Sequence, residues 1–191
     1  MQLAGCVLAG GHSSRMGRDK SLLRMNGRSM HAVALDKLSG CTEALYTSGE
    51  SVDPEEHRST VLKDPYGCGP LGGIVVALEA IEAEWVLFLP IDMPLVPQAW
   101  MERLAALTRT TEASAILTRT EDGEQPLVAA YRTALLPDLK QAVEAGRYKV
   151  TAALPALVQW QDATGFPPEQ FRNLNTPGEV SSLRALGFDI S

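Results

Sequence analysis

The chain of 191 residues contains 45% hydrophobic and 21% charged residues, which is typical of one globular domain and excludes a disordered or fibrous chain. Its 17 basic and 23 acidic residues give a net charge of -6 without a long run of Lys or Arg, which argues against nucleic acid as a partner. No apolar stretch approaches the roughly 20 residues of a bilayer span, and residues 1–10 lack the basic residues of a secretory signal, so we expect neither a membrane segment nor export.

Short apolar runs bounded by Gly, Pro, Asp or Ser alternate with helical patterns in the first half of the chain. This alternation predicts βα units on a mostly parallel sheet. The predicted strands are Leu3–Leu8, Glu43–Thr47, Thr60–Lys63 and Trp85–Leu89, and the predicted helices are Ser29–Leu38, Gly72–Ala83 and Pro97–Leu107. Because Trp85–Leu89 is the most hydrophobic of these strands, we expect it at the centre of the sheet.

The second half predicts an antiparallel portion of the same sheet. Strands at Ser114–Thr118 and Leu127–Tyr131 flank a turn at Glu121–Gly123, and a helix covers Ala134–Ala145. Thr176 and Glu179 have the spacing of a capping box with Pro177 at the first helical position, which predicts a helix after Asn175. Three cysteines without a C-x-x-C pair argue against a disulfide framework or a tetrahedral zinc site and favour the reducing cytoplasm.

A glycine-rich segment, Leu8–Lys20, follows the first predicted strand. Glycines let backbone N–H groups approach an anion closely, and Arg15 and Lys20 can neutralise the charges of a polyphosphate, so the segment suits a nucleoside triphosphate. It matches neither the G-x-x-x-x-G-K-[ST] nor the G-x-G-x-x-G pattern. A solvated turn remains the alternative for this segment taken alone.

Asp92 follows the hydrophobic strand Trp85–Leu89. Ligands of open α/β sheets bind beyond the carboxyl ends of the strands, where both Asp92 and the glycine-rich segment are expected. A carboxylate repels a triphosphate unless a cation lies between them, and Mg²⁺ held by one or two carboxylates and phosphate oxygens is the usual solution. Asp92 is therefore a candidate Mg²⁺ ligand, with a helix-capping or turn aspartate as the alternative.

Several segments together resemble the molybdenum cofactor guanylyltransferases, which are nucleotidyltransferases with a single Rossmann-like α/β domain. The resemblance extends from Leu3 to about Leu186 and rests on motifs in the family's order: residues 8–20 as L-A-G-G-x-S-x-R-M-G-x-D-K, Asp64, Gly69–Gly73, Pro90–Pro94, Gln125–Leu127 and Asn173–Pro177. The first motif also occurs in cytidylyl and sugar nucleotidyltransferases. The resemblance implies one three-layer α/β/α domain over residues 1–191, with a nucleotide-binding half at about 1–107 and an acceptor-binding half at about 108–191.

The resemblance also implies roles for individual residues. The backbone of Leu8, Ala9, Gly10 and Gly11 would contact the guanine nucleotide, Arg15 and Lys20 would bind its phosphates, Asp64 would belong to the guanine-nucleotide site, Asp92 would hold Mg²⁺, and Asn173 and Asn175 would lie near the reacting phosphates and the pterin. An asparagine that the family often carries after the second strand corresponds to Thr47. Thr47, or its neighbour Ser48, can still hydrogen-bond the nucleotide through a hydroxyl.

The activity implied is transfer of GMP from GTP to the terminal phosphate of molybdenum-carrying molybdopterin with release of pyrophosphate. Arg15, Lys20 and Mg²⁺ on Asp92 would provide positioning and charge neutralisation, and no covalent protein intermediate is needed. Proteins that deliver molybdopterin or mature molybdoenzymes are possible partners, in the cytoplasm. The alternatives are the same transfer with CTP, a sugar-1-phosphate nucleotidyltransferase, and a non-catalytic nucleotide-binding adaptor of molybdoenzyme maturation.

Overall fold

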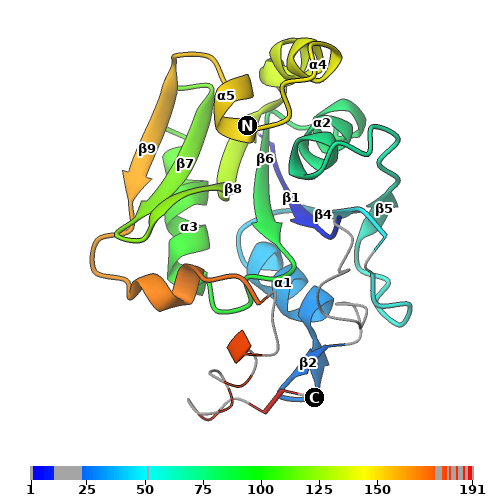
Figure 1. The fold of residues 1–191 in the computed structure, drawn as a ribbon, viewed down its shortest axis with the longest axis vertical. Helices are drawn as coiled ribbons and strands as arrows, with labels where there is room; N and C mark the ends of the chain where they lie inside the picture. Colours follow the sequence, from blue (N-terminus) through cyan, green and yellow to red (C-terminus); the bar gives the residue numbers. More distant parts are fainter. Residues whose placement is uncertain are drawn as a thin grey trace.

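One sheet of seven strands organises the chain. The computed structural model describes residues 2–10, 23–50, 52–174, 178–179, 181, 184, 187 and 189–190. The strand order is β5-β4-β1-β6-β8-β7-β9 (Figure 1). These strands are β1 (Leu3–Leu8), β4 (Ala44–Ser48), β5 (Thr60–Leu62), β6 (Trp85–Pro90), β7 (Ala115–Thr120), β8 (Gly123–Arg132) and β9 (Val158–Asp162).

The sheet is mixed and mostly parallel. Strand β8 runs antiparallel to its neighbours β6 and β7, whereas every other neighbouring pair in the sheet is parallel. Strand β6 occupies the middle position, and all six of its residues are buried. The predicted sheet, its antiparallel portion and its central strand are therefore confirmed.

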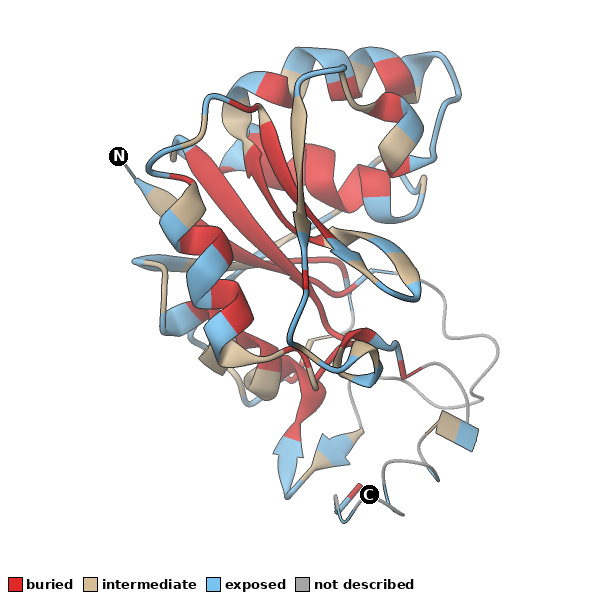
Figure 2. Cartoon of the chain, turned by 90° about the vertical axis from the view of Figure 1, so that its left-hand side faces the viewer, coloured by how far each residue is buried: buried red, intermediate tan, exposed pale blue. Residues whose placement is uncertain are grey.

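Helices cover both faces of this sheet. The helices α1 (Met30–Ser39) and α3 (Gln98–Leu107) share one core with Val7 and Leu87, whereas α2 (Pro70–Ala80), α4 (Leu136–Glu144) and α5 (Val150–Ala153) share a second core with Cys6 and Phe88. Successive strand residues thus enter opposite cores, as the pleat of a strand requires. Figure 2 shows the buried strands between these helices, so the three-layer α/β/α architecture is confirmed.

Helix boundaries differ from the predictions by a few residues for local reasons. Helix α1 begins one residue later than predicted because Ser29 is its N-cap and accepts a hydrogen bond at 3.1 Å from the backbone N–H of Ala32. Helix α2 begins at Pro70, two residues earlier than predicted, because a proline fits the first turn. Pro97 is the N-cap of α3 and not its first helical residue.

Four elements were not predicted. They are the hairpin strands β2 (Arg24–Met25) and β3 (Arg28–Ser29), the helix α5 and the edge strand β9. Asn26 and Gly27 join β2 to β3 with positive φ angles of 52° and 77°, and Ile190 near the carboxyl terminus pairs with Met25 beside this hairpin. Two short 3₁₀ turns, η2 (Thr133–Leu135) and η3 (Pro168–Phe171), complete the described elements.

Two remaining expectations concern the carboxyl-terminal helix and membrane-spanning segments. Thr176 and Pro177, which were expected to begin a helix, lie outside them. Within the described part of the chain, none of the helices is long and apolar enough to span a bilayer.

Candidate active site

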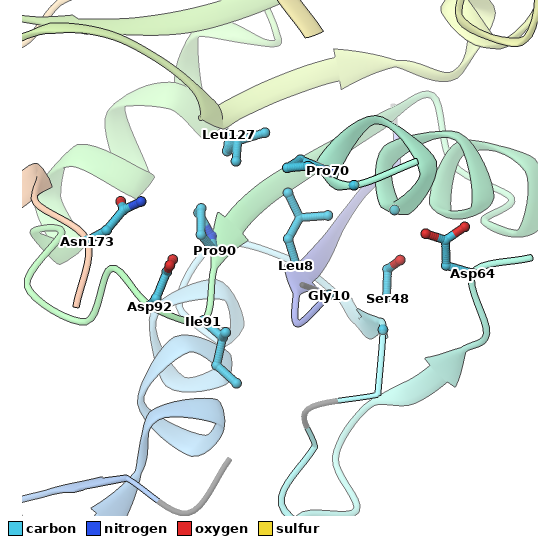
Figure 3. A pocket seen from close by; sticks show the side chains of 13 residues that line it. Leu8, Gly10, Ser48, Asp64, Pro70, Pro90, Ile91, Asp92, Leu127 and Asn173 are labelled. Carbon is cyan, nitrogen blue, oxygen red and sulfur yellow. The ribbon is translucent and has the colours of Figure 1, made fainter. Parts of the chain in front are cut away.

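A cavity opens at the carboxyl ends of β1, β4 and β6, where ligands of open α/β sheets bind (Figure 3). It receives residues from segments far apart in the sequence. The lining residues are Leu8, Gly10, Ser48, Gly49, Asp64, Gly69, Pro70, Gly73, Pro90, Ile91, Asp92, Leu127 and Asn173.

Backbone hydrogen bonds continue the sheet into the rim of this cavity. The N–H of Ala9 donates to the carbonyl of Ser48 at 2.8 Å, and the N–H of Ile91 donates to the carbonyl of Leu8 at 3.0 Å. The first residues after β1, β4 and β6 are therefore fixed side by side. Leu8 and Gly10 line the cavity, whereas the side chain of Ala9 packs into the core beneath α1.

Gly49 permits a close approach between two of these segments. Its φ is +119°, and a Cβ at this position would lie 2.5 Å from the carbonyl carbon of Ala9 and from the nitrogen of Gly10. An L-residue fits neither the backbone angle nor the space. The glycine therefore holds the end of β4 against the segment that follows β1.

Two further glycines bring the beginning of α2 against the sheet edge. A Cβ on Gly73 would lie 3.1 Å from Ser48 Oγ and 3.2 Å from Leu8 Cδ2, and a Cβ on Gly72 would lie 2.7 Å from Asp64 Oδ2. Larger residues would push the helix outwards. The pair of glycines thus shapes one wall of the cavity.

Asp64 lies at the β5 side of the cavity, just after that strand. Its Oδ1 accepts hydrogen bonds from the backbone N–H groups of Tyr66 at 2.8 Å and Gly67 at 3.3 Å. This turn fixes the carboxylate, because a short aspartate side chain readily bonds the backbone two or three residues ahead. Asp64 therefore has a defined orientation beside the first turn of α2.

Asp92 lies on the other side of the cavity, in the turn after β6. Its backbone carbonyl accepts a hydrogen bond at 2.7 Å from the N–H of Leu174. This bond ties the segment after η3 to the turn after β6 and places Asn173 beside Asp92 at the cavity (Figure 3). A carboxylate from the middle of the chain and an amide from near its carboxyl end therefore meet at one rim.

Comparison with known proteins identifies the family. Residues 5–160 match the family model of the MobA-like NTP transferase domain. The chain belongs to this family. It is therefore a nucleotidyltransferase, and the family expected from the motifs is confirmed.

Relatives match nearly the full chain. A molybdenum cofactor guanylyltransferase of Vibrio atlanticus is 33% identical over 195 residues, which cover 97% of each chain, and a probable molybdenum cofactor guanylyltransferase of Synechococcus elongatus is 31% identical over 197 residues, covering 96% of this chain and 99% of the other. The crystal structure of molybdopterin-guanine dinucleotide biosynthesis protein A from Archaeoglobus fulgidus superposes with a TM-score of 0.80 at 22% identity, covering 96% of this chain and 98% of that one. This structural similarity supports the nucleotidyltransferase fold of the chain.

The carboxylate and amide oxygens at the Asp92 rim are of the kind that binds a divalent cation shared with a substrate. No group of three or more His, Cys, Asp or Glu side chains within the described residues could enclose a metal ion. Mg²⁺ does not require such a group, since it commonly takes one or two protein carboxylates and completes its octahedron with phosphate oxygens and water. Asp92, with Asn173 as its neighbour, matches this donor set.

Thr47 is not brought to the cavity, which corrects the expectation for this residue. Its side chain is fully buried, and Oγ1 lies 2.8 Å from both His31 Nε2 and Ser59 Oγ. Successive residues of a strand point to opposite faces, so Thr47 faces α1 whereas Ser48 faces α2 and the cavity. The alternative residue, Ser48, is the one that lines the site.

Buried His31 explains why the Thr47 hydroxyl is occupied. The backbone N–H of Asp53 donates to Nδ1 of His31 at 3.2 Å, which leaves Nε2 to donate to Thr47. Burial lowers the pKa of His31, whereas the nearby carboxylates of Glu56 and Asp53 raise this pKa and the Arg58 guanidinium lowers it. A neutral imidazole thus completes a hydrogen-bond network outside the cavity.

The structure brings Leu8, Gly10, Asp64, Asp92 and Asn173 together, as their shared site requires. Gly11, Arg15, Lys20 and Asn175 lie outside the described residues. Among the lining residues, Gly49 alone lies outside every motif and candidate residue of the sequence analysis, and the quoted motifs contain six lining residues that were given no individual role: Gly69, Pro70, Gly73, Pro90, Ile91 and Leu127. Gly49 had a usable signal, since a glycine directly after a strand often marks a close backbone approach.

Proposed function

We propose that this chain transfers GMP from GTP to the terminal phosphate of molybdenum-carrying molybdopterin and releases pyrophosphate. The supporting observation is one cavity at the carboxyl ends of β1, β4 and β6 that places Asp64 at one end and Asp92 with Asn173 at the other. The names of the relatives that match nearly the whole chain agree with this reaction.

The reaction forms a bond between an acceptor phosphate oxygen and the α-phosphorus of GTP and breaks the bond from that phosphorus to the oxygen of the leaving pyrophosphate. The acceptor is already an anion, so it needs little help from a general base. The chain's task is to align the two phosphates and offset their charge. Arg15 and Lys20 would bind the phosphates of the nucleotide, and the rim at Leu8–Gly10 would position it.

Asp92 and Asn173 would hold the divalent cation, for which we propose Mg²⁺. When bound, this cation supplies the positive charge that lets a triphosphate lie beside a carboxylate. The side chain of Asn173 would orient the acceptor phosphate by donating from its amide nitrogen, with Asn175 as a second candidate donor. The acceptor-binding half at 108–191 contributes Leu127 and Asn173 to the cavity.

Guanine is the preferred base in this proposal. A guanine site pairs its buried polar groups with the carbonyl and amino edge of the purine, and each group left unpaired by cytosine costs on the order of 1–3 kcal/mol. Two such losses give CTP a penalty of at least roughly 30-fold, at about 1.4 kcal/mol per factor of ten.

A competition assay tests this proposal. The purified chain is given equal concentrations of GTP and CTP with Mg²⁺ and a molybdopterin acceptor, and both dinucleotide products are quantified. We expect the guanine product to dominate and pyrophosphate to appear in equal amount. A ratio near one, or one in favour of CTP, would assign the chain to cytidylyl transfer, and nucleotide binding without any product would favour the adaptor.

A further inference from the structure

The hydroxyl of Ser48 is buried and has no hydrogen-bond partner within the described residues. Ser48 is 1% exposed and is one of the residues that line the cavity, and its Oγ is buried. Buried hydroxyls are normally paired, because an unpaired one loses its hydrogen bonds to water and gains nothing in return. This group therefore points to a ligand that supplies the missing partner.

The backbone on both sides fixes the direction of this hydroxyl. The carbonyl of Ser48 accepts from the N–H of Ala9 at 2.8 Å, and the N–H of Gly49 donates to the carbonyl of Leu62 at 3.2 Å. Ser48 is thus held between β1 and β5 with its side chain on the α2 face. It cannot join the network of Thr47, which lies on the α1 face of the same strand.

Gly73 lies against the hydroxyl and adds no side chain over it. A Cβ at Gly73 would come within 3.1 Å of Ser48 Oγ, so any other residue at this position would cover that atom. Both residues line the cavity. The absence of a side chain at Gly73 therefore leaves the buried hydroxyl without a covering side chain from the beginning of α2.

The strand order places Ser48 at the end of the cavity away from the metal ligand. Asp92 follows β6 and Ser48 ends β4, with β1 between these strands, as the order of the labelled residues in Figure 3 also shows. The strands β4 and β6 are two strand spacings apart, which is about 9.6 Å. A nucleotide with its α-phosphate near Asp92 that extends along this edge brings its base to Ser48 and Asp64.

We propose that the Ser48 hydroxyl hydrogen-bonds the guanine base and contributes to the choice of GTP over CTP. This inference rests on the proposed function. Serine suits the role because a hydroxyl both donates and accepts, as the mixed edge of guanine does. Ser48 therefore takes the role that the family motif led us to assign to Thr47.

The test compares wild type with Ser48→Ala by calorimetric titration of Mg·GTP, Mg·CTP and inorganic tripolyphosphate. One neutral hydrogen bond corresponds to a loss of roughly three- to tenfold in GTP affinity. We expect this loss for GTP, with unchanged affinities for CTP and tripolyphosphate. The melting temperature without ligand should stay the same or rise, because the substitution removes an unpaired buried polar atom.

Thr47→Val is the matched control, since it removes the hydroxyl of the adjacent residue on the opposite face. It should lower the melting temperature, through the lost bonds to His31 and Ser59, and leave the ratio of GTP to CTP affinity unchanged.

If wild type binds no GTP, the proposed function and this inference both fail. If wild type prefers GTP and Ser48→Ala prefers it equally, only the inference fails. An equal loss for tripolyphosphate would place the hydroxyl at the phosphates and overturn the assignment to the base.

Discussion

At the scale of single residues, Asp92 is the position where a loss of activity can be distinguished most clearly from a loss of stability. Its carboxylate is half-buried at the rim of the cavity, whereas its backbone carbonyl carries the structural contact to Leu174. Replacing the side chain leaves this backbone bond in place. The proposed metal-binding role of the side chain and the structural role of the backbone can therefore be tested apart.

Asp92→Asn should retain the fold and lose metal-dependent transfer. An amide is nearly isosteric with a carboxylate but offers Mg²⁺ no negative charge, so we expect kcat/KM to fall by roughly a hundredfold through the loss of metal-assisted catalysis. Transfer rates over a Mg²⁺ titration and a melting curve measure the two effects. Asp138→Asn, in the first turn of α4, is the control and should remain active. Near-normal transfer by folded Asp92→Asn would remove Asp92 from the metal site.

Gly49→Ala should damage both stability and nucleotide binding. The added Cβ meets the Ala9 and Gly10 backbone at 2.5 Å, and the φ of +119° is strained for alanine, so we expect a loss of about 1–3 kcal/mol in the free energy of unfolding. Gly67→Ala is the control, because Gly67 has a φ of +59° with open space around its Cβ position. Denaturant titrations should rank Gly49→Ala as the less stable. The opposite ranking would contradict the close approach at β1.

That Ser48 and not Thr47 lines the cavity shows what could not be predicted about the site from the sequence. Strand alternation predicts that these two side chains face opposite ways, and both carry a hydroxyl. Which of them faces the cavity depends on which face of β4 packs against α1, and residues distant in the chain decide this. His31, which occupies the Thr47 hydroxyl, lies on that helix.

At the scale of elements, the same histidine ties three segments together. His31 of α1 bonds Thr47 of β4 and accepts from the backbone of Asp53. The Thr47 hydroxyl then continues the network to Ser59, which precedes β5. This network anchors the edge of the sheet that carries Ser48 and Asp64.

The network should make stability depend on pH. Burial lowers the pKa of His31 below its ordinary value, so between these two values the unfolded chain binds more protons than the folded one. The contribution is fully present above about pH 6.5 and is lost as the pH falls through the pKa of the folded state, by at most about 1.4 kcal/mol per pH unit. Denaturant unfolding of wild type and His31→Gln at pH 7 and pH 5 measures this. Glutamine cannot be protonated, so wild type should lose more stability, and equal losses would contradict the neutral buried imidazole.

The elements differ in how well their sequences predict them. Strands β1 and β6 are uninterrupted apolar runs because helices cover both of their faces, and such runs are easily found. Strand β9 alternates Val158 and Trp160 with glutamines and pairs with β7 at the sheet edge, so a short, half-exposed run carried a weaker signal. The hairpin at Asn26 and Gly27 had a strong turn signal that was overlooked.

At the scale of the whole molecule, the cavity draws on both predicted halves of the chain. Leu127 from β8 and Asn173 after η3 lie in the proposed acceptor half, yet they line the same cavity as Leu8 and Asp64. The antiparallel β8 lies beside β6, which brings this half to the site. Motif order along the sequence could indicate that these segments share one site. Their arrangement around the cavity depends on pairings between distant strands.

Nucleotide binding across these segments should stabilise the whole chain by a free energy that grows with the logarithm of the ratio of ligand concentration to Kd. A ligand at one hundred times its Kd adds about 2.7 kcal/mol to the free energy of unfolding, and each kcal/mol raises the melting temperature by about 2–4 °C for a chain of this length. Mg·GTP at that concentration should therefore raise the melting temperature by about 5–10 °C. Mg·CTP at the same concentration, if bound roughly 30-fold more weakly, should raise it by only about 2–3 °C.

Metal removal provides the internal control for this melting experiment. Without Mg²⁺ no metal ion would lie between the phosphates near Asp92 and its carboxylate, which lines the cavity, so chelation with EDTA should remove most of the GTP shift. Asp92→Asn should respond less to EDTA than wild type, because this carboxylate is gone. A GTP shift that is insensitive to EDTA in wild type would show that cations of the chain alone balance the phosphates, and would exclude Asp92 as the site of an essential metal ion for binding.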